Sequence, residues 1–139
     1  MPKVGVLILL LLLAGCGEEL RRQDLIRLNG YWEIEEVEGP GGNSKGYGLN
    51  TTIDYLKLDG DTGYRKKVQP QLDGSFVTSD DAALFRIREK DGAFFMVYLE
   101  GDAEWEERLL KLDPNAFSVV NEENYTYHYR RYQPITTRP

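Results

Sequence analysis

Apolar and polar residues alternate along most of this chain, in short runs separated by turn-forming residues. In an extended run, alternate side chains point to opposite faces, so one face can be buried while the other stays hydrated. Evenly spaced runs joined by tight turns are typical of an antiparallel barrel or sandwich. The predicted strands are 31–37, 53–58, 64–68, 75–78, 84–88, 94–99, 104–112, 117–120 and 125–132.

The same alternation assigns an apolar face to several of these strands. The residues placed on it are Trp32, Ile34, Leu56, Leu58, Phe85, Ile87, Tyr125, Tyr127 and Tyr129. Segment 94–99 is apolar on both faces, so we expect it to lie under the N-terminal segment or against a partner. We predict an all-β fold, a small antiparallel up-and-down β-barrel of eight or nine strands. A two-sheet sandwich is the alternative.

The first 28 residues follow a different pattern. An apolar run of ten residues, 4–13, follows Lys3. It is too short to span a bilayer as a helix, but it has the length of the apolar region of a signal peptide. The charged stretch 19–28 predicts a short helical turn, with acidic residues at its start and arginines further in. The predicted divisions are a signal peptide 1–15, an anchor and short helix 16–27, a barrel 28–133 and a flexible tail 134–139.

The string Leu13-Ala14-Gly15-Cys16 resembles the lipobox of bacterial lipoproteins. The resemblance implies that Cys16 is acylated and becomes the first residue of the mature protein. Several acyl chains hold a protein firmly to a membrane, whereas one chain holds it only marginally. Because Gly17 rather than aspartate follows the cysteine, the resemblance also implies an outer-membrane location, on the periplasmic side or at the surface. The alternative is an unmodified thiol in an ordinary secretory signal.

Composition narrows the possible partners. Removal of residues 1–15 leaves 124 residues, enough for one domain with a modest core. The net charge of −6 becomes −7 once Lys3 is lost. This acidic balance argues against nucleic acid and against adhesion to anionic lipid. Because Cys16 is the only cysteine, no intramolecular disulfide can form.

The tripeptide Gly30-Tyr31-Trp32 opens the first predicted strand, directly after the short helical turn. It resembles the G-x-W signature of lipocalins and their bacterial lipocalin-like relatives. The resemblance implies that Gly30 permits a tight entry into the strand and that Trp32 closes one end of the barrel. It also implies that an arginine of the last strand packs over Trp32. We expect Arg130 in this role, with Arg131 as the alternative. Such a pair contributes about 0.5–2 kcal/mol.

The resemblance covers about residues 25–132. Segments 61–68 and 105–112 look like short lipocalin-like lipoproteins of the Bacteroidetes type, although the T-D-Y element of many lipocalins has no match. The resemblance implies an outer-membrane lipoprotein that binds a small apolar or amphipathic ligand. The alternative is a protein-interaction module of the envelope, an inhibitor or accessory subunit with a filled barrel.

A ligand would enter at the end of the barrel where the first strand finishes. The glycine-rich segment 39–50 follows this strand, and long loops in compact domains are often functional. We predict that it forms a lid; a connector over a filled barrel is the alternative. Glu36 would be a polar anchor if its strand has no bulge. The candidate ligand-binding residues are Glu36, Tyr47, Tyr55, Trp105 and Tyr127.

Other patterns carry no catalytic or metal signature. Since His128 is the only histidine, any Ser–His–Asp triad must include it, and His-rich metal sites are excluded. The acidic segment 59–63 lacks the distal glutamate of a calcium loop and predicts a hairpin tip. The run Arg65-Lys66-Lys67 predicts a solvated strand face, with contact to an anionic ligand as the alternative. We predict no enzymatic activity, no metal and no cofactor.

Overall fold

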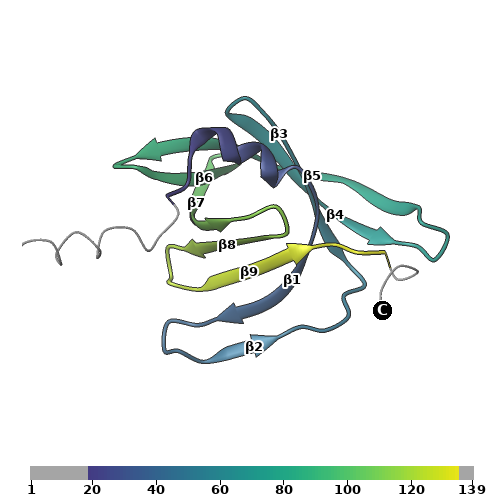
Figure 1. The fold of residues 1–139 in the computed structure, drawn as a ribbon. Coiled ribbons are helices and arrows are strands. Elements are labelled where there is room, and N and C mark those ends of the chain that lie inside the picture. The colour runs from purple at the N-terminus through teal and green to yellow at the C-terminus, as the bar shows by residue number, and fades with distance from the viewer. Residues whose placement is uncertain (1–18, 135–139) are drawn as a thin grey trace, which may run out of the picture.

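The computed structural model describes residues 19–134, which form one nine-stranded antiparallel sheet that closes on itself (Figure 1). The strands are β1 (Gly30–Glu38), β2 (Ser44–Gly46), β3 (Ile53–Asp59), β4 (Thr62–Pro70), β5 (Phe76–Lys90), β6 (Ala93–Glu100), β7 (Ala103–Leu112), β8 (Ala116–Asn121) and β9 (Thr126–Arg131). The order is β2-β1-β3-β4-β5-β6-β7-β8-β9, and β1 also pairs with β9. Eight strands therefore close a barrel, and β2 is an extra strand on β1. The predicted up-and-down barrel is confirmed. Cys16 and the predicted signal peptide lie outside the described residues.

Two strand predictions are wrong in detail. The runs 75–78 and 84–88 belong to one continuous strand, β5. Between the pairs Lys66–Ala82 and Val68–Thr78, β5 has more residues than β4 and bulges, so it continues past Asp80 and Asp81, where the alternation pattern predicts a break. The second difference is β2, which lies within the segment predicted as a loop.

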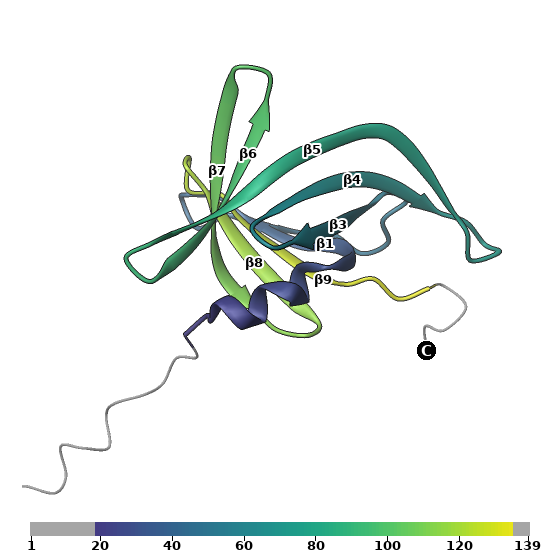
Figure 2. The same cartoon turned by 90° about the horizontal axis from the view of Figure 1, so that it is seen from above.

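A short 3₁₀-helix, η2 (Arg22–Leu28), lies at one end of the barrel, which we call the closed end (Figure 2). A helix of this length is not stable alone, so tertiary contacts must hold it. Leu25 and Leu28 are buried in the barrel, and Arg22 forms ion pairs with Asp61 at 2.6 Å and Glu89 at 3.2 Å. Within residues 19–134, no helix is long and apolar enough to cross a membrane.

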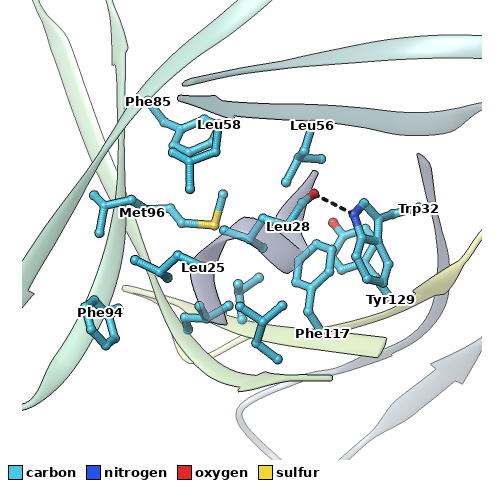
Figure 3. Packing of buried hydrophobic residues seen from close by; sticks show 14 of the residues in the cluster. Leu25, Leu28, Trp32, Leu56, Leu58, Phe85, Phe94, Met96, Phe117 and Tyr129 are labelled. Atoms are coloured by element: carbon cyan, nitrogen blue, oxygen red, sulfur yellow. Dashed lines mark hydrogen bonds between the residues drawn. The ribbon is translucent and has the colours of Figure 1, made fainter. Parts of the chain in front are cut away.

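Apolar side chains fill the barrel interior next to η2 (Figure 3). Trp32 is fully buried, its Nε1 donates to the carbonyl of Leu28 at 2.8 Å, and its ring meets Phe117 edge-on at 4.7 Å. The Phe117 ring in turn stacks on Tyr129 at 4.6 Å. The other core residues are Leu25, Leu56, Leu58, Phe85, Ile87, Phe94, Met96, Tyr98, Leu109, Leu112 and Val119.

Arg131, rather than Arg130, packs over Trp32. Its guanidinium carbon lies 3.8 Å from the centroid of the tryptophan ring. Arg130 lies on the outer face of β9, where its Nε donates to Glu33 Oε1 at 2.7 Å. The expectation of Arg130 is wrong because Trp32 pairs directly with Arg131 in the β1–β9 register, whereas Arg130 is opposite Glu33. Arg131 also donates to the carbonyls of Arg27, Asn29 and Pro114.

Gly30 is required at the entry to β1 for two reasons. Its φ of +124° is one that residues with a side chain rarely adopt. A Cβ at this position would also lie 2.5 Å from Nη1 of Arg131. The glycine therefore makes room for the arginine that covers Trp32.

Strand β6 is apolar on both faces, and ion pairs of the neighbouring strands cover its outer face. Val97 points outward and is nonetheless fully buried. Arg86 pairs with Glu104 at 3.2 Å, and Arg88 pairs with Glu106 at 2.6 Å, each pair linking β5 to β7 across β6. The arginine stems shield apolar surface while their charged ends stay hydrated.

Candidate functional site

The barrel interior becomes polar toward the end opposite η2, which we call the open end. Arg65 of β4 points inward there. The β3–β4 hairpin pairs Leu56 with Arg65 and Leu58 with Gly63, and both leucines belong to the core. Residues that face each other across paired strands share a face of the sheet, so the register directs Arg65 into the barrel. The prediction that 65–67 form a solvated face is therefore wrong for Arg65.

Arg65 connects four other strands of the barrel through hydrogen bonds and ion pairs. Its Nη1 donates to the hydroxyl of Tyr98 at 3.0 Å, and Nη2 donates to Tyr129 at 2.6 Å and to Asp54 Oδ2 at 3.2 Å. Glu107 Oε1 lies 3.7 Å from Nη1. These four partners come from β6, β9, β3 and β7. A buried charge is tolerated only when it is paired in this way.

The network changes the pKa values of its members. Burial alone would raise the pKa of Asp54, but Arg65 and Lys67 together outweigh burial, so this pKa is lowered. Burial raises the pKa of Glu107 despite the opposing Arg65. Burial also raises the pKa of Tyr129 to about 12. At neutral pH, Asp54 is therefore ionised and the tyrosine is a neutral hydroxyl.

A cavity of about 610 Å³ opens over this network, between β3, β4, β5 and β6. Its inner side carries Asp54 and Arg65, whereas Asp80, Asp81 and Glu100 are exposed at its rim. The remaining lining residues are Lys66, Lys67, Ala82, Ala83 and Leu99. The cavity combines a buried charged network with access from solvent, which makes it the candidate site.

None of the predicted ligand-binding residues lines this cavity, but two of them lie beside the network. Trp105 of β7 stacks on Tyr98, with ring centroids 5.6 Å apart, and remains 38% exposed. Part of this residue is therefore accessible to solvent at the open end. Tyr127 of β9 is half-buried and packs against the core cluster. Both rings belong to the inward side, next to Glu107.

Tyr47 lies at the open end but in a separate hollow. This hollow, of about 460 Å³, is formed by the β1–β2 hairpin and Tyr125. The ammonium of Lys45 lies 5.1 Å from the centroid of the Tyr47 ring. Tyr47 therefore flanks the barrel mouth without lining the cavity over Arg65.

Glu36 and Tyr55 point away from the interior. A register shift between Ile34 and Glu36 reverses the alternation, so Glu36 pairs with the outward-facing His128. Glu36 would point inward only if its strand had no bulge, and this strand has one. Tyr55 belongs to an aromatic cluster outside the barrel, where its ring lies 4.7 Å from Tyr31.

The segment 39–50 is held against β1 by hydrogen bonds, and these contacts do not support the lid hypothesis. Ser44–Gly46 pairs with the end of β1. The N–H of Tyr47 donates to the carbonyl of Glu35 at 2.8 Å, and Nδ2 of Asn50 donates to that of Ile34 at 3.1 Å. These bonds complete the stretch of β1 that neither β2 nor β3 reaches.

The outer face carries a chain of contacts that resembles a catalytic triad. Ser118 Oγ lies 2.7 Å from His128 Nδ1, and His128 Nε2 lies 3.2 Å from Glu38 Oε1. A nucleophile must be reached by its substrate, yet Ser118 is only 4% exposed. Its backbone is engaged with strands on both sides, so it cannot supply the N–H groups of an oxyanion hole. We interpret these contacts as a link across the β1–β9 seam.

Residues 19–134 contain no cluster of three or more histidine, cysteine or acidic side chains that could hold a metal ion. No family model matches the sequence, and no curated protein is significantly similar to it. Among solved structures, a lipocalin-like protein from Bacteroides uniformis is similar to this chain, with 10% identity and a TM-score of 0.48. The match covers 76% of this chain and 99% of that one.

Proposed function

We propose that this protein is an outer-membrane lipoprotein that binds a small amphipathic ligand at the open end of its barrel. The observation that carries the proposal is the division of the interior into two halves. Packed apolar side chains fill the half next to η2, and the other half opens into the cavity over Arg65 and Asp54. A volume of about 610 Å³ falls within the range of small-molecule sites, roughly 300–1,000 Å³.

The same division limits the kind of ligand. Leu56, Phe85 and Met96 are almost completely buried beneath the network, so a long acyl chain finds no room there. Trp105 is a partly exposed aromatic residue at the mouth, and the network offers hydrogen-bonding groups. A compact molecule with one polar and one apolar part fits this arrangement best.

Tryptophan fluorescence tests the proposal, because Trp105 lies at the mouth and Trp32 is buried at the closed end. We expect a library of small aromatic, aliphatic and amphipathic compounds to contain members that change the emission of the wild-type protein. A ligand that stacks on an exposed ring changes the polarity around that ring and the quenching of its fluorescence, whereas Trp32 is buried and covered by Arg131.

Trp105→Phe is the matched control for this screen. The variant keeps an aromatic ring on Tyr98 and retains only the buried tryptophan, so genuine hits should lose most of their effect. Compounds that change both proteins equally act elsewhere. If no compound distinguishes the two proteins, the binding proposal fails.

A protein-interaction role is the second candidate, and one surface feature favours it. Leu84 and Leu99 face each other across β5 and β6 on the outside of the barrel, and they are 58% and 37% exposed. Adjacent exposed leucines are characteristic of a contact surface. This function would be favoured if the screen finds no ligand and a protein partner binds to wild type but not to Leu84→Ser.

The membrane anchor has a separate test. We expect Cys16→Ala to move the protein from the outer-membrane fraction to the soluble fraction, because the thiol is the proposed site of acylation. Fractionation of cells followed by immunoblotting measures the change, and Cys16→Ser serves as a second substitution. A Cys16→Ala protein that stays in the outer-membrane fraction would contradict the anchor but leave the barrel's ligand binding open to its own test.

A further inference from the structure

We infer that the cavity over Asp54 selects ligands that carry a cationic amine, and that Lys67 occupies the amine position in the unliganded protein. The inference rests on the proposed ligand binding and names its chemistry. Asp54 lies at the inner side of the cavity and is only 3% exposed.

The two oxygens of Asp54 are satisfied differently. Oδ2 accepts from Arg65 at 3.2 Å. Oδ1 is buried and receives no aligned hydrogen bond from the described part of the chain; the ammonium of Lys67 lies 2.7 Å away as an ion pair without that alignment. A buried carboxylate oxygen in this position leaves a preference for a better-placed cationic donor.

Lys67 is suited to act as a replaceable occupant. Its side chain is 68% exposed, whereas that of Asp54 is only 4% exposed. The lysine stem therefore lies in solvent, and its ammonium can leave the cavity with little loss of packing. Because only the carboxylate of this pair is buried, a ligand ammonium that aligns better with Oδ1 can take the place of the exposed lysine.

The charges around the cavity favour a cation over an anion. Its lining contains four carboxylates, Asp54, Asp80, Asp81 and Glu100, and three basic side chains, Arg65, Lys66 and Lys67. Arg65 is already paired with Asp54 and Glu107, and the ammonium of Lys66 lies 5.5 Å from the centroid of the outward-facing Tyr64 ring. The unmatched charge at the rim is negative, which attracts an amine and repels a carboxylate.

A set of three compounds of similar shape tests the inference: 2-phenylethylamine, the neutral 2-phenylethanol and the anionic phenylacetate. Each carries the same aromatic ring, and only the head group differs. We expect isothermal titration calorimetry on the mature protein in non-ionic detergent at neutral pH to show that the amine binds most tightly. Lys67→Met should strengthen amine binding about 10-fold, because it removes the competing ammonium.

Further variants separate this effect from general damage. Asp54→Asn should weaken amine binding about 10-fold, and the rim variant Glu100→Gln, which leaves the buried network intact, should weaken it by a smaller factor. Lys57→Met is the matched control for Lys67→Met, since Lys57 is exposed on the outer face of β3. It should leave the affinity for the amine unchanged.

The outcomes distinguish this inference from the proposed function. Equal or tighter binding of 2-phenylethanol or phenylacetate would overturn the amine preference and leave the binding barrel standing. An unchanged or lower affinity of Lys67→Met for the amine would overturn the role of Lys67. If none of the three compounds binds to wild type or to Lys67→Met, the amine inference falls, and the wider fluorescence screen decides the proposed function.

Discussion

Replacing Trp32 by alanine is expected to lower the free energy of unfolding by about 3–5 kcal/mol. The ring is fully buried, contacts Phe117 edge-on and is covered by Arg131. Its Nε1 also holds the carbonyl of Leu28 and so connects β1 to η2. The surrounding barrel is closed by backbone hydrogen bonds and cannot collapse into the space left behind. Urea denaturation followed by circular dichroism measures the loss.

A double-mutant cycle isolates the part of this energy that belongs to Arg131. We expect Trp32→Ala and Arg131→Met to be coupled by about 0.5–2 kcal/mol, the size of a cation–π contact. Arg130→Met is the matched control, because Arg130 lies on the same strand but binds Glu33 on the outer face. Coupling of Trp32 to Arg130 instead of Arg131, or to neither, would contradict the arrangement at the closed end.

The second large effect is expected from Arg65→Met, at about 3–5 kcal/mol of destabilisation at neutral pH. Methionine fills similar volume but leaves Asp54 without its buried partner and Glu107 without its nearest cation. The hydroxyls of Tyr98 and Tyr129 also lose the hydrogen bonds that Arg65 donates to them. Urea denaturation at neutral pH measures the loss.

Compensation and pH test this explanation further. Adding Asp54→Asn and Glu107→Gln to Arg65→Met should recover much of the stability, because the stranded charges are then gone. The pKa of Asp54 is lowered in the folded wild type, so its contribution is present above the unfolded pKa, about 3.9, and is lost as the pH falls through the folded value. The gap between wild type and Arg65→Met should therefore narrow in acid. A gap that stays constant, or a triple variant less stable than Arg65→Met, would refute the network.

The fold could be predicted because its signals are local. Alternation places apolar residues on one face of each strand, and glycine- and aspartate-containing turns divide the strands. The position of Trp32 at the start of the first strand was also visible in the sequence. The choice between Arg130 and Arg131 was not, because it depends on the register between β1 and β9, two strands at opposite ends of the chain.

Most of the candidate site could not be predicted, because the two lysines that follow Arg65 favour an outward position for it. In a run of three basic residues, a solvated face is the ordinary interpretation. The β3–β4 hairpin contained a better indication. A two-residue turn at 60–61 pairs Asp59 with Thr62, and the same register then places Arg65 opposite the core residue Leu56. Alternation within the hairpin would therefore have directed Arg65 inward.

Other misplacements have no local signal. The bulge that turns Glu36 outward and the one that lets β5 run past Asp80 are both set by how neighbouring strands fit together. Segment 39–50 is rich in glycine, which suggested a lid, yet it is held by bonds to the backbone of β1. Backbone acceptors are present at every residue, so the sequence does not show which of them a loop will use.

The central claim, a small ligand bound at the open end of the barrel, is tested most directly by native mass spectrometry. The protein would be extracted from its own cell envelope, freed of bulk lipid and compared with Trp105→Ala prepared in the same way. The account predicts a small-molecule adduct on the wild-type protein that is absent or much reduced on the variant. A wild-type protein that carries no adduct, or an adduct that both proteins retain equally, would contradict it.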